Sequence, residues 1–159
     1  MTRGAAIASI CAVTIGLDRI TKLLAQEFLR ARAPRIYLGD FFRLQYVENP
    51  GAFLSLGSGL SMDSRIWSLT VAVGLLLVIM AWILIKKRLD RWTTIALSLL
   101  LAGGAGNWID RAFRRAHTVV DFMNVGIGGL RTGIFNVADM AITAGVAILI
   151  IRSLRDPQK

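Results

Sequence analysis

Two acidic residues stand in apolar surroundings, where a carboxylate is costly to keep charged. Asp139 lies near the start of the apolar stretch 134–151, which is long enough to cross a bilayer. Asp121 lies between Val120 and Phe122 in another apolar patch. An acid inside a membrane helix indicates a functional site by default. The apolar neighbours of Asp121 are expected to raise its pKa by desolvation.

Two neighbouring carboxyls can hydrolyse an amide. Like charges resist joint ionisation, so such a pair shares one proton. The ionised member can take a proton from water, and the protonated member can donate to a carbonyl oxygen. Water then attacks the amide without a covalent intermediate. Asp139 and Asp121 form the best candidate pair. Asp110 and Asp18 are expected to be ionised and structural, because each has a basic residue nearby in the sequence.

Four apolar stretches must position these acids, and each is predicted to be a membrane span. They cover residues 4–25, 66–85, 92–111 and 134–151. In four successive antiparallel helices, the end of the first, the end of the third and the start of the fourth meet at one membrane face. The spans carry polar residues at that face, among them Asp18, Lys22, Asn107, Asp110, Arg111, Asn136 and Asp139.

Helical spacing predicts contacts among these polar residues. Asp18 and Lys22 are four residues apart on one helix face and can form an ion pair. Asn136 stands three residues before Asp139, so its amide can orient that carboxyl. Small residues from Gly103 onward would allow another helix to approach closely.

The two connectors 26–65 and 112–133 are too long to be turns. Residues 42–47 alternate apolar and polar side chains, which is typical of a half-buried strand, and 36–38 can form a second short strand. The connector 112–133 is rich in glycine near its end, which fits either a lid over the site or a plain flexible connector. The expected fold is an all-α membrane protein with one domain of four transmembrane helices. A small extracytoplasmic β element would lie between the first two.

Basic residues predict the orientation in the membrane. The short connector 86–91 is densely basic, so the positive-inside rule assigns it to the cytoplasm. Both termini would then be cytoplasmic, and the polar face would lie near the outer membrane surface. The N-terminal apolar stretch has no convincing cleavage site and is expected to remain as the first span.

Composition excludes several classes of protein. Hydrophobic residues make up 55% of the chain, and its net charge of +9 comes from basic residues beside the apolar stretches. Because they form no single basic stripe with aromatic residues between them, nucleic-acid binding is not expected. One cysteine and one histidine exclude an intrachain disulfide and argue against a histidine-based metal site. We expect neither a metal nor a cofactor.

Four motifs, in order, resemble those of the lipoprotein signal peptidases, also called signal peptidase II, a family of membrane aspartic peptidases. They are D-x-x-x-K at 18–22, G-N-x-x-D-R at 106–111, V-D-F at 120–122 and F-N-x-A-D at 135–139. A fifth motif departs from the N-x-G-A-A-F-S of the family, because residues 49–55 read N-P-G-A-F-L-S. That difference suggests a narrowed set of substrates.

The resemblance implies a role for each matching residue. Asp121 and Asp139 would be the catalytic pair. Residues that bind substrate or support the pair would be Asn49, Gly51, Asn107, Arg111 and Asn136, and residues that hold the helices together would be Asp18, Lys22, Gly103 and Asp110. The implied substrate is a prolipoprotein whose cysteine carries diacylglycerol, cut just before that cysteine in the bacterial cytoplasmic membrane. Membrane lipids are the other expected partners, and we expect a monomer.

Two other functions could use the same residues. A proton-coupled transporter would need polar groups along a path through both halves of the membrane, and the uncharged stretch 66–85 argues against it. A non-catalytic membrane adaptor derived from the family would keep the fold without needing the carboxyls. The aspartic endopeptidase is the favoured hypothesis, because it explains why the acids gather at one membrane face.

Overall fold

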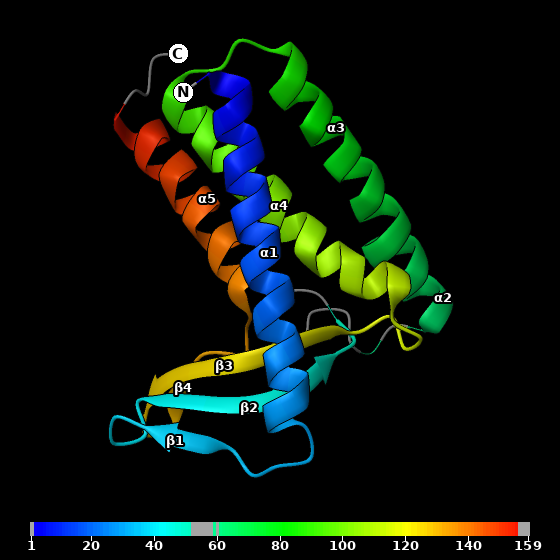
Figure 1. Cartoon of the computed structure of the whole chain (residues 1–159), viewed down its shortest axis with the longest axis vertical. Helices are drawn as coiled ribbons and strands as arrows, with labels where there is room; N and C mark the ends of the chain where they lie inside the picture. Colours follow the sequence, from blue (N-terminus) through cyan, green and yellow to red (C-terminus); the bar gives the residue numbers. More distant parts are fainter. Residues whose placement is uncertain (1, 52–58, 60, 156–159) are drawn as a thin grey trace.

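A computed structural model describes residues 2–51, 59 and 61–155 of the chain. Four long helices run side by side, and a sheet lies across one end of them (Figure 1). The helices are α1 (Arg3–Leu29), a continuous helix made of α2 (Met62–Arg65), η2 (Ile66–Ala72) and α3 (Val73–Lys86), then α4 (Arg91–Phe113) and α5 (Val137–Arg155). The strands are β1 (Arg35–Tyr37), β2 (Phe42–Asn49), β3 (Val119–Ile127) and β4 (Leu130–Arg131).

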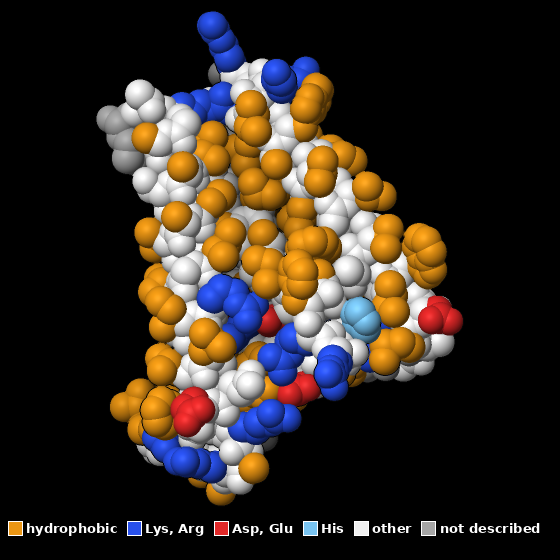
Figure 2. All heavy atoms as spheres, turned by 45° about the vertical axis from the view of Figure 1, so that its right-hand side comes forward, with side chains coloured by type: hydrophobic (Ala, Val, Ile, Leu, Met, Phe, Trp, Pro, Cys, Tyr) orange, Lys and Arg blue, Asp and Glu red, His pale blue; other side chains and the backbone are white. Residues whose placement is uncertain are grey.

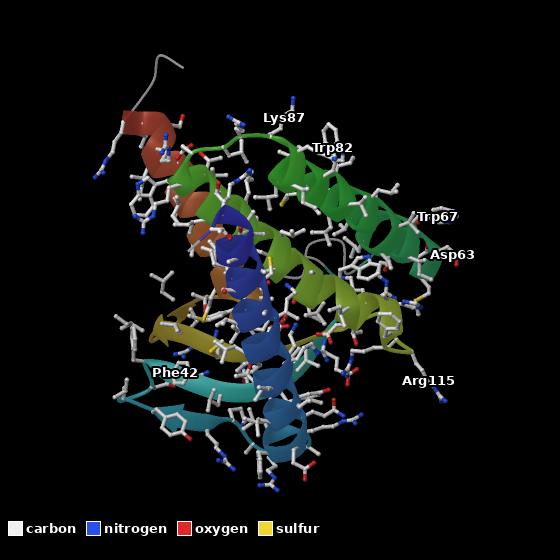
Figure 3. All side chains as sticks on the ribbon, turned by 45° about the horizontal axis from the view of Figure 1, so that its top comes forward. Phe42, Asp63, Trp67, Trp82, Lys87 and Arg115 are labelled. Atoms are coloured by element: carbon white, nitrogen blue, oxygen red, sulfur yellow. The ribbon has the colours of Figure 1, made fainter. Side chains whose placement is uncertain are left out.

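Apolar side chains face outward along the helices (Figure 2), as expected of a surface that contacts lipid. Trp67 and Trp82 point away from the bundle, between Asp63 and Lys87 at the two ends of their helix (Figure 3). Among the described residues, two helices are long and apolar enough to cross a membrane by length and composition, Met62–Lys86 and Val137–Arg155. The helices α1 and α4 fall outside that criterion, because more polar residues interrupt them.

The sheet takes strands from both long connectors. Its order is β1-β2-β3-β4, and each neighbouring pair is antiparallel. The two strands expected in the first connector are present. The prediction of strands only between the first two helices was incomplete, because the second connector also forms strands. The glycine-rich connector contributes β3 and β4 instead of an irregular loop. Residues 119–123 are valines, an aspartate, a phenylalanine and a methionine, most of which favour strands, and pairing with β2 satisfies their backbone groups.

Small residues allow α4 to lie directly against α5. A methyl group added at Gly103 would lie 2.4 Å from the carbonyl oxygen of Ala138, and one at Gly145 would lie 2.8 Å from that of Ala96. At the sheet end of the bundle, the last turns of α1 pack on the sheet. Their buried cluster consists of Ala25, Leu29, Val120 and Phe122. Helices and sheet therefore share one core at the level of the polar residues.

Replacing Gly103 by alanine is expected to lower stability by about 1–3 kcal/mol, because α4 and α5 would have to separate. The new methyl group would also lie 2.8 Å from Cγ1 of Ile142. Gly16→Ala is the matched control in α1, since its methyl group would meet nothing within 4 Å. That control should be neutral or stabilising by up to roughly 1 kcal/mol. Melting temperatures in detergent measure both effects, and equal values would contradict tight packing at Gly103.

Candidate active site

Two carboxyls come together where β3 passes the N-terminus of α5. The backbone N–H groups of Phe122 and Met123 donate to the carbonyl oxygen of Phe135 at 3.0 and 2.9 Å, which holds the start of α5 against β3. Asp121 and Asp139 are both buried, with 2% and 9% of their surfaces exposed. The sequence predicts a loop position for Asp121, whereas the structure shows it within β3.

Asn136 precedes α5 and links the two acids. Its side-chain oxygen accepts from the backbone N–H of Asp139 at 2.9 Å, and the Asp139 carboxylate accepts from the backbone N–H of Asn136 at 3.1 Å. This reciprocal capping box satisfies N–H groups that a helix start leaves unpaired. The Asn136 amide nitrogen also donates to Asp121 Oδ1 at 2.6 Å. One asparagine therefore contacts both carboxyls.

Two further asparagines fix the orientation of the acids. Asn107 of α4 donates from Nδ2 to Asp139 Oδ1 at 2.8 Å, and its oxygen accepts from Asn136 Nδ2 at 3.1 Å. Asn49 at the end of β2 donates from Nδ2 to Asp121 Oδ2 at 2.9 Å. Each carboxyl therefore accepts two N–H···O hydrogen bonds from other parts of the chain.

Arg111 of α4 adds a positive charge beside the acids. Its Nη2 donates to the carbonyl oxygen of Gly51 at 2.6 Å, and the Gly51 N–H donates to the side chain of Asn49 at 2.9 Å. In the described part of the chain no carboxylate lies within 4 Å of Arg111. Its charge is nevertheless attracted by Asp121 and Asp139. Residues 52–55, which complete the altered motif, lie outside the described residues.

A cavity of about 170 Å³ opens beside the two acids. Its polar lining consists of Asn49, Asn107, Arg111, Asp121 and Asp139, and its apolar lining of Leu69, Val73, Gly104, Val119 and Ile142. The sequence predicts each of these polar residues as a site residue. It does not predict that they line the same cavity. The apolar lining carries no local signal, because similar side chains occur throughout the four helices.

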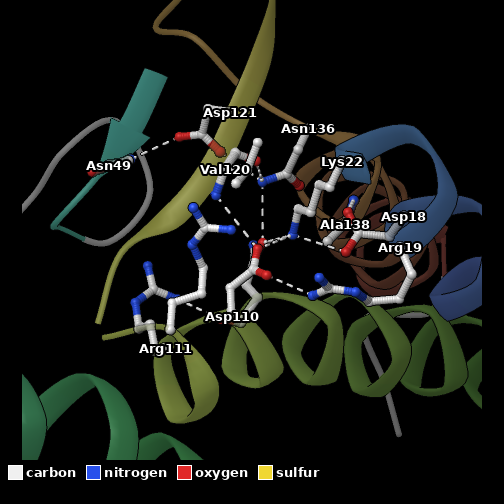
Figure 4. A network of polar contacts seen from close by, with 12 residues as sticks. Asp18, Arg19, Lys22, Asn49, Asp110, Arg111, Val120, Asp121, Asn136 and Ala138 are labelled. Atoms are coloured by element: carbon white, nitrogen blue, oxygen red, sulfur yellow. Dashed lines mark hydrogen bonds and ion pairs between the residues drawn. The ribbon is translucent and has the colours of Figure 1, made fainter. Parts of the chain in front are cut away.

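A buried ionic cluster lies next to the acids (Figure 4). Lys22 Nζ lies 2.8 Å from Asp18 Oδ2 and 2.9 Å from Asp110 Oδ2. Arg19 lies 2.5 Å from the other oxygen of Asp110. The sequence predicts the pairing of Asp18 with Lys22, but Arg19 was missed. Its position three residues before Lys22, on the same face of α1, is the signal that could have identified it.

The ionic cluster contacts both α5 and the acids. Asp18 Oδ1 accepts from the backbone N–H of Ala138 in the first turn of α5 at 3.0 Å. Lys22 donates to Asn107 Oδ1 at 2.9 Å, and Asn107 in turn donates to Asp139. The cluster therefore helps to orient Asp139 without an ion pair to that carboxyl.

The pKa of Asp121 is raised to about 6. Burial is the main cause because it disfavours the charged form, and the negative charge of Asp139 adds to it. Hydrogen bonds from Asn49 and Asn136 and the charge of Lys22 act in the opposite direction. The direction agrees with the desolvation expected from the apolar neighbours of Asp121.

The fold places the chain in the class of bacterial membrane enzymes. A solved structure described as a bacterial membrane enzyme superposes with a TM-score of 0.83 at 28% identity, covering 98% of this chain and 90% of that chain. A second one has a TM-score of 0.81 at 27% identity, covering 96% of this chain and 94% of that chain. The outward-facing apolar side chains agree with that class.

The family follows from the sequence comparisons. A family model described as signal peptidase (SPase) II matches residues 10–155. The lipoprotein signal peptidase of Streptococcus pneumoniae is 32% identical over 98% of this chain and 97% of that protein. That of Francisella tularensis subsp. novicida is 35% identical over 91% of this chain and 89% of that protein. The chain belongs to the signal peptidase II family and is an aspartic endopeptidase, which confirms the family expected from the motifs.

Replacing Lys22 by methionine is expected to destabilise the protein by roughly 3–5 kcal/mol, because Asp18 would keep a buried charge without a cation. The double variant Asp18→Asn/Lys22→Met should recover part of that loss. Lys86→Met removes the same charge from an exposed position and serves as the control. Thermal unfolding in detergent measures all three. Equal stability of Lys22→Met and the control would show that the cluster does not support the fold.

The raised pKa of Asp121 predicts a pH-dependent difference in stability. Because the folded state holds this proton up to about pH 6 and the unfolded state only to about 3.8, rising pH lowers wild-type stability between those values. Asp121→Asn lacks this slope. Its free energy of unfolding relative to wild type should therefore increase by about 2 kcal/mol from pH 4 to pH 6.5 and change little above that. A difference independent of pH would contradict the raised pKa.

Proposed function

We propose that the chain removes signal peptides from prolipoproteins, cutting before a cysteine that carries diacylglycerol, with Asp121 and Asp139 as the catalytic pair. The relatives in Streptococcus pneumoniae and Francisella are named lipoprotein signal peptidases, which supports the substrate class. The observation that carries the proposal is the pair of buried carboxyls on one cavity, linked by Asn136. Two buried carboxyls on one cavity support a pair of acids that shares a proton.

In the proposed reaction, Asp121 holds the proton of the pair and Asp139 the negative charge. Burial favours the protonated form of Asp121. Asp139 lies in the first turn of α5, where the helix dipole stabilises an anion. Asp139 takes a proton from water as the water oxygen bonds to the amide carbon, and Asp121 donates its proton to the carbonyl oxygen. The carbon–nitrogen bond then breaks as Asp139 passes its proton to the leaving nitrogen, while Asp121 recovers a proton from the hydroxyl group.

The other polar residues orient the two acids, bind the substrate or hold the helices together. Asn49, Asn107 and Asn136 hold the two acids through the hydrogen bonds described above. Arg111 contacts the carbonyl oxygen of Gly51 and lines the cavity, so its remaining donors can bind carbonyl groups of the substrate. Residues that hold α1, α4 and α5 together around the site are Asp18, Lys22, Gly103 and Asp110.

The proposal includes a membrane orientation. All four long helices cross the cytoplasmic membrane as a monomer, with both termini in the cytoplasm and the sheet outside. Support comes from the basic side chains at the end of the bundle opposite the sheet, which include Lys86, Lys87, Arg88, Arg91 and Arg152. In this orientation the acids lie near the outer surface, at the depth where a lipid-anchored cysteine would present its peptide bond.

Asp121→Asn and Asp139→Asn are each expected to lower cleavage of a diacylated precursor by roughly 10²–10⁴-fold, because an amide side chain cannot transfer the proton. A gel-shift assay with purified protein measures cleavage. Asp63→Asn, at an exposed acid of α2, is the control and should cleave normally.

Normal cleavage by either variant would rule out the catalytic pair. Unchanged activity of both in cells would support the adaptor instead. Proton flux in vesicles that disappears in Asp139→Asn would support a transporter.

A further inference from the structure

A second cavity, of about 630 Å³, opens at the end of the bundle away from the sheet. It lies between the first turns of α1 and α4, beside the connection between α3 and α4, and is separate from the cavity at the two acids. Nothing in the proposed reaction uses it. Its lining includes Arg3, Ala6, Ile10, Leu89, Arg91 and Ile95.

Two guanidinium groups of this cavity have no acidic partner. Among the described residues, no carboxylate lies within 4 Å of Arg3 or Arg91. Arg3 Nη2 donates to the carbonyl oxygen of Leu84 at 2.7 Å, but its buried Nε has no hydrogen-bond partner there. The nearby acid, Asp90, caps α4 and pairs with Arg152. The cavity therefore has an uncompensated positive charge.

The walls next to these arginines are apolar. Arg3, Ala6 and Ile10 follow one another along a single face of α1, over about 10 Å of helix. Arg91 and Ile95 repeat this order on α4, one turn apart. Positive charge at one end and apolar surface along the rest complement a molecule with an anionic head and a hydrocarbon tail.

We propose that this cavity binds an anionic phospholipid of the cytoplasmic leaflet. Its phosphate contacts Arg3 and Arg91, and one acyl chain lies along Ala6 and Ile10. Basic pockets between membrane helices on the cytoplasmic side are suited to such headgroups. The choice of leaflet rests on the proposed orientation, whereas binding itself does not depend on the peptidase function. A lipid held here joins α1 to α4 and stabilises the bundle at the end remote from the acids.

Native mass spectrometry of the purified chain in neutral detergent tests the proposal, with dioleoyl phosphatidylglycerol compared against dioleoyl phosphatidylcholine. The wild type should retain phosphatidylglycerol preferentially, and this lipid should raise its melting temperature. Arg3→Gln/Arg91→Gln should bind it about tenfold more weakly or worse. Lys86→Gln/Lys87→Gln removes the same charge from exposed positions at the same end and should bind as wild type does.

A second variant tests the apolar part of the cavity. Ala6→Phe keeps both arginines but fills the space along α1, so it should also weaken binding of phosphatidylglycerol. Equal retention of the two lipids by the wild type would overturn the proposal, as would equal losses in the two double variants. Inorganic phosphate that binds as tightly as the lipid would also overturn it, in favour of a simple anion site. Precursor cleavage in phosphatidylcholine micelles should be unchanged in these variants, which separates this test from that of the catalytic pair.

Discussion

The N-terminus of α5 begins inside the protein, and its backbone N–H groups must find partners there. A helix start leaves several such groups unpaired, and at this position they are buried. The side chains of Asn136 and Asp139 each accept a hydrogen bond from the other residue's backbone N–H. Asp18 of α1 accepts from the N–H of Ala138. A carboxyl of the proposed catalytic pair is therefore also part of a helix cap. Because the same hydrogen bonds serve both purposes, the helix start and the site form together.

Charge neutralisation extends this constraint to α4. The buried carboxylate of Asp18 requires a cation, and Lys22 supplies it while also neutralising Asp110. Lys22 has a further contact with Asn107, which donates to Asp139. Lys22 of the ionic cluster is therefore linked to Asp139 through a single residue, Asn107. A change in the ionic cluster would alter the orientation of that carboxyl as well as the packing of the helices.

The sheet supplies the second acid and its support. Asp121 lies within β3, flanked by β2, which carries Asn49, and held near α5 by the hydrogen bonds to Phe135. A strand restricts the position of a carboxyl more than an irregular loop does, so the pair is oriented before substrate arrives. The junction between sheet and helices would also suit the proposed substrate, whose lipid would stay in the membrane while its peptide bond reached the acids.

The sequence by itself determined which residues are chemically unusual and which family they indicate. Asp139 and Asp121 are acidic residues among apolar neighbours, where a charge is costly. This property is local, so the sequence around each acid reveals it. The long helices follow from local apolar stretches in the same way. Only the tertiary structure decided the partners, such as Asn49 with Asp121 across 72 positions and Lys22 with two carboxylates. It also decided that the second connector forms β3 beside β2, because strand pairing depends on contacts between distant segments that neither segment specifies alone.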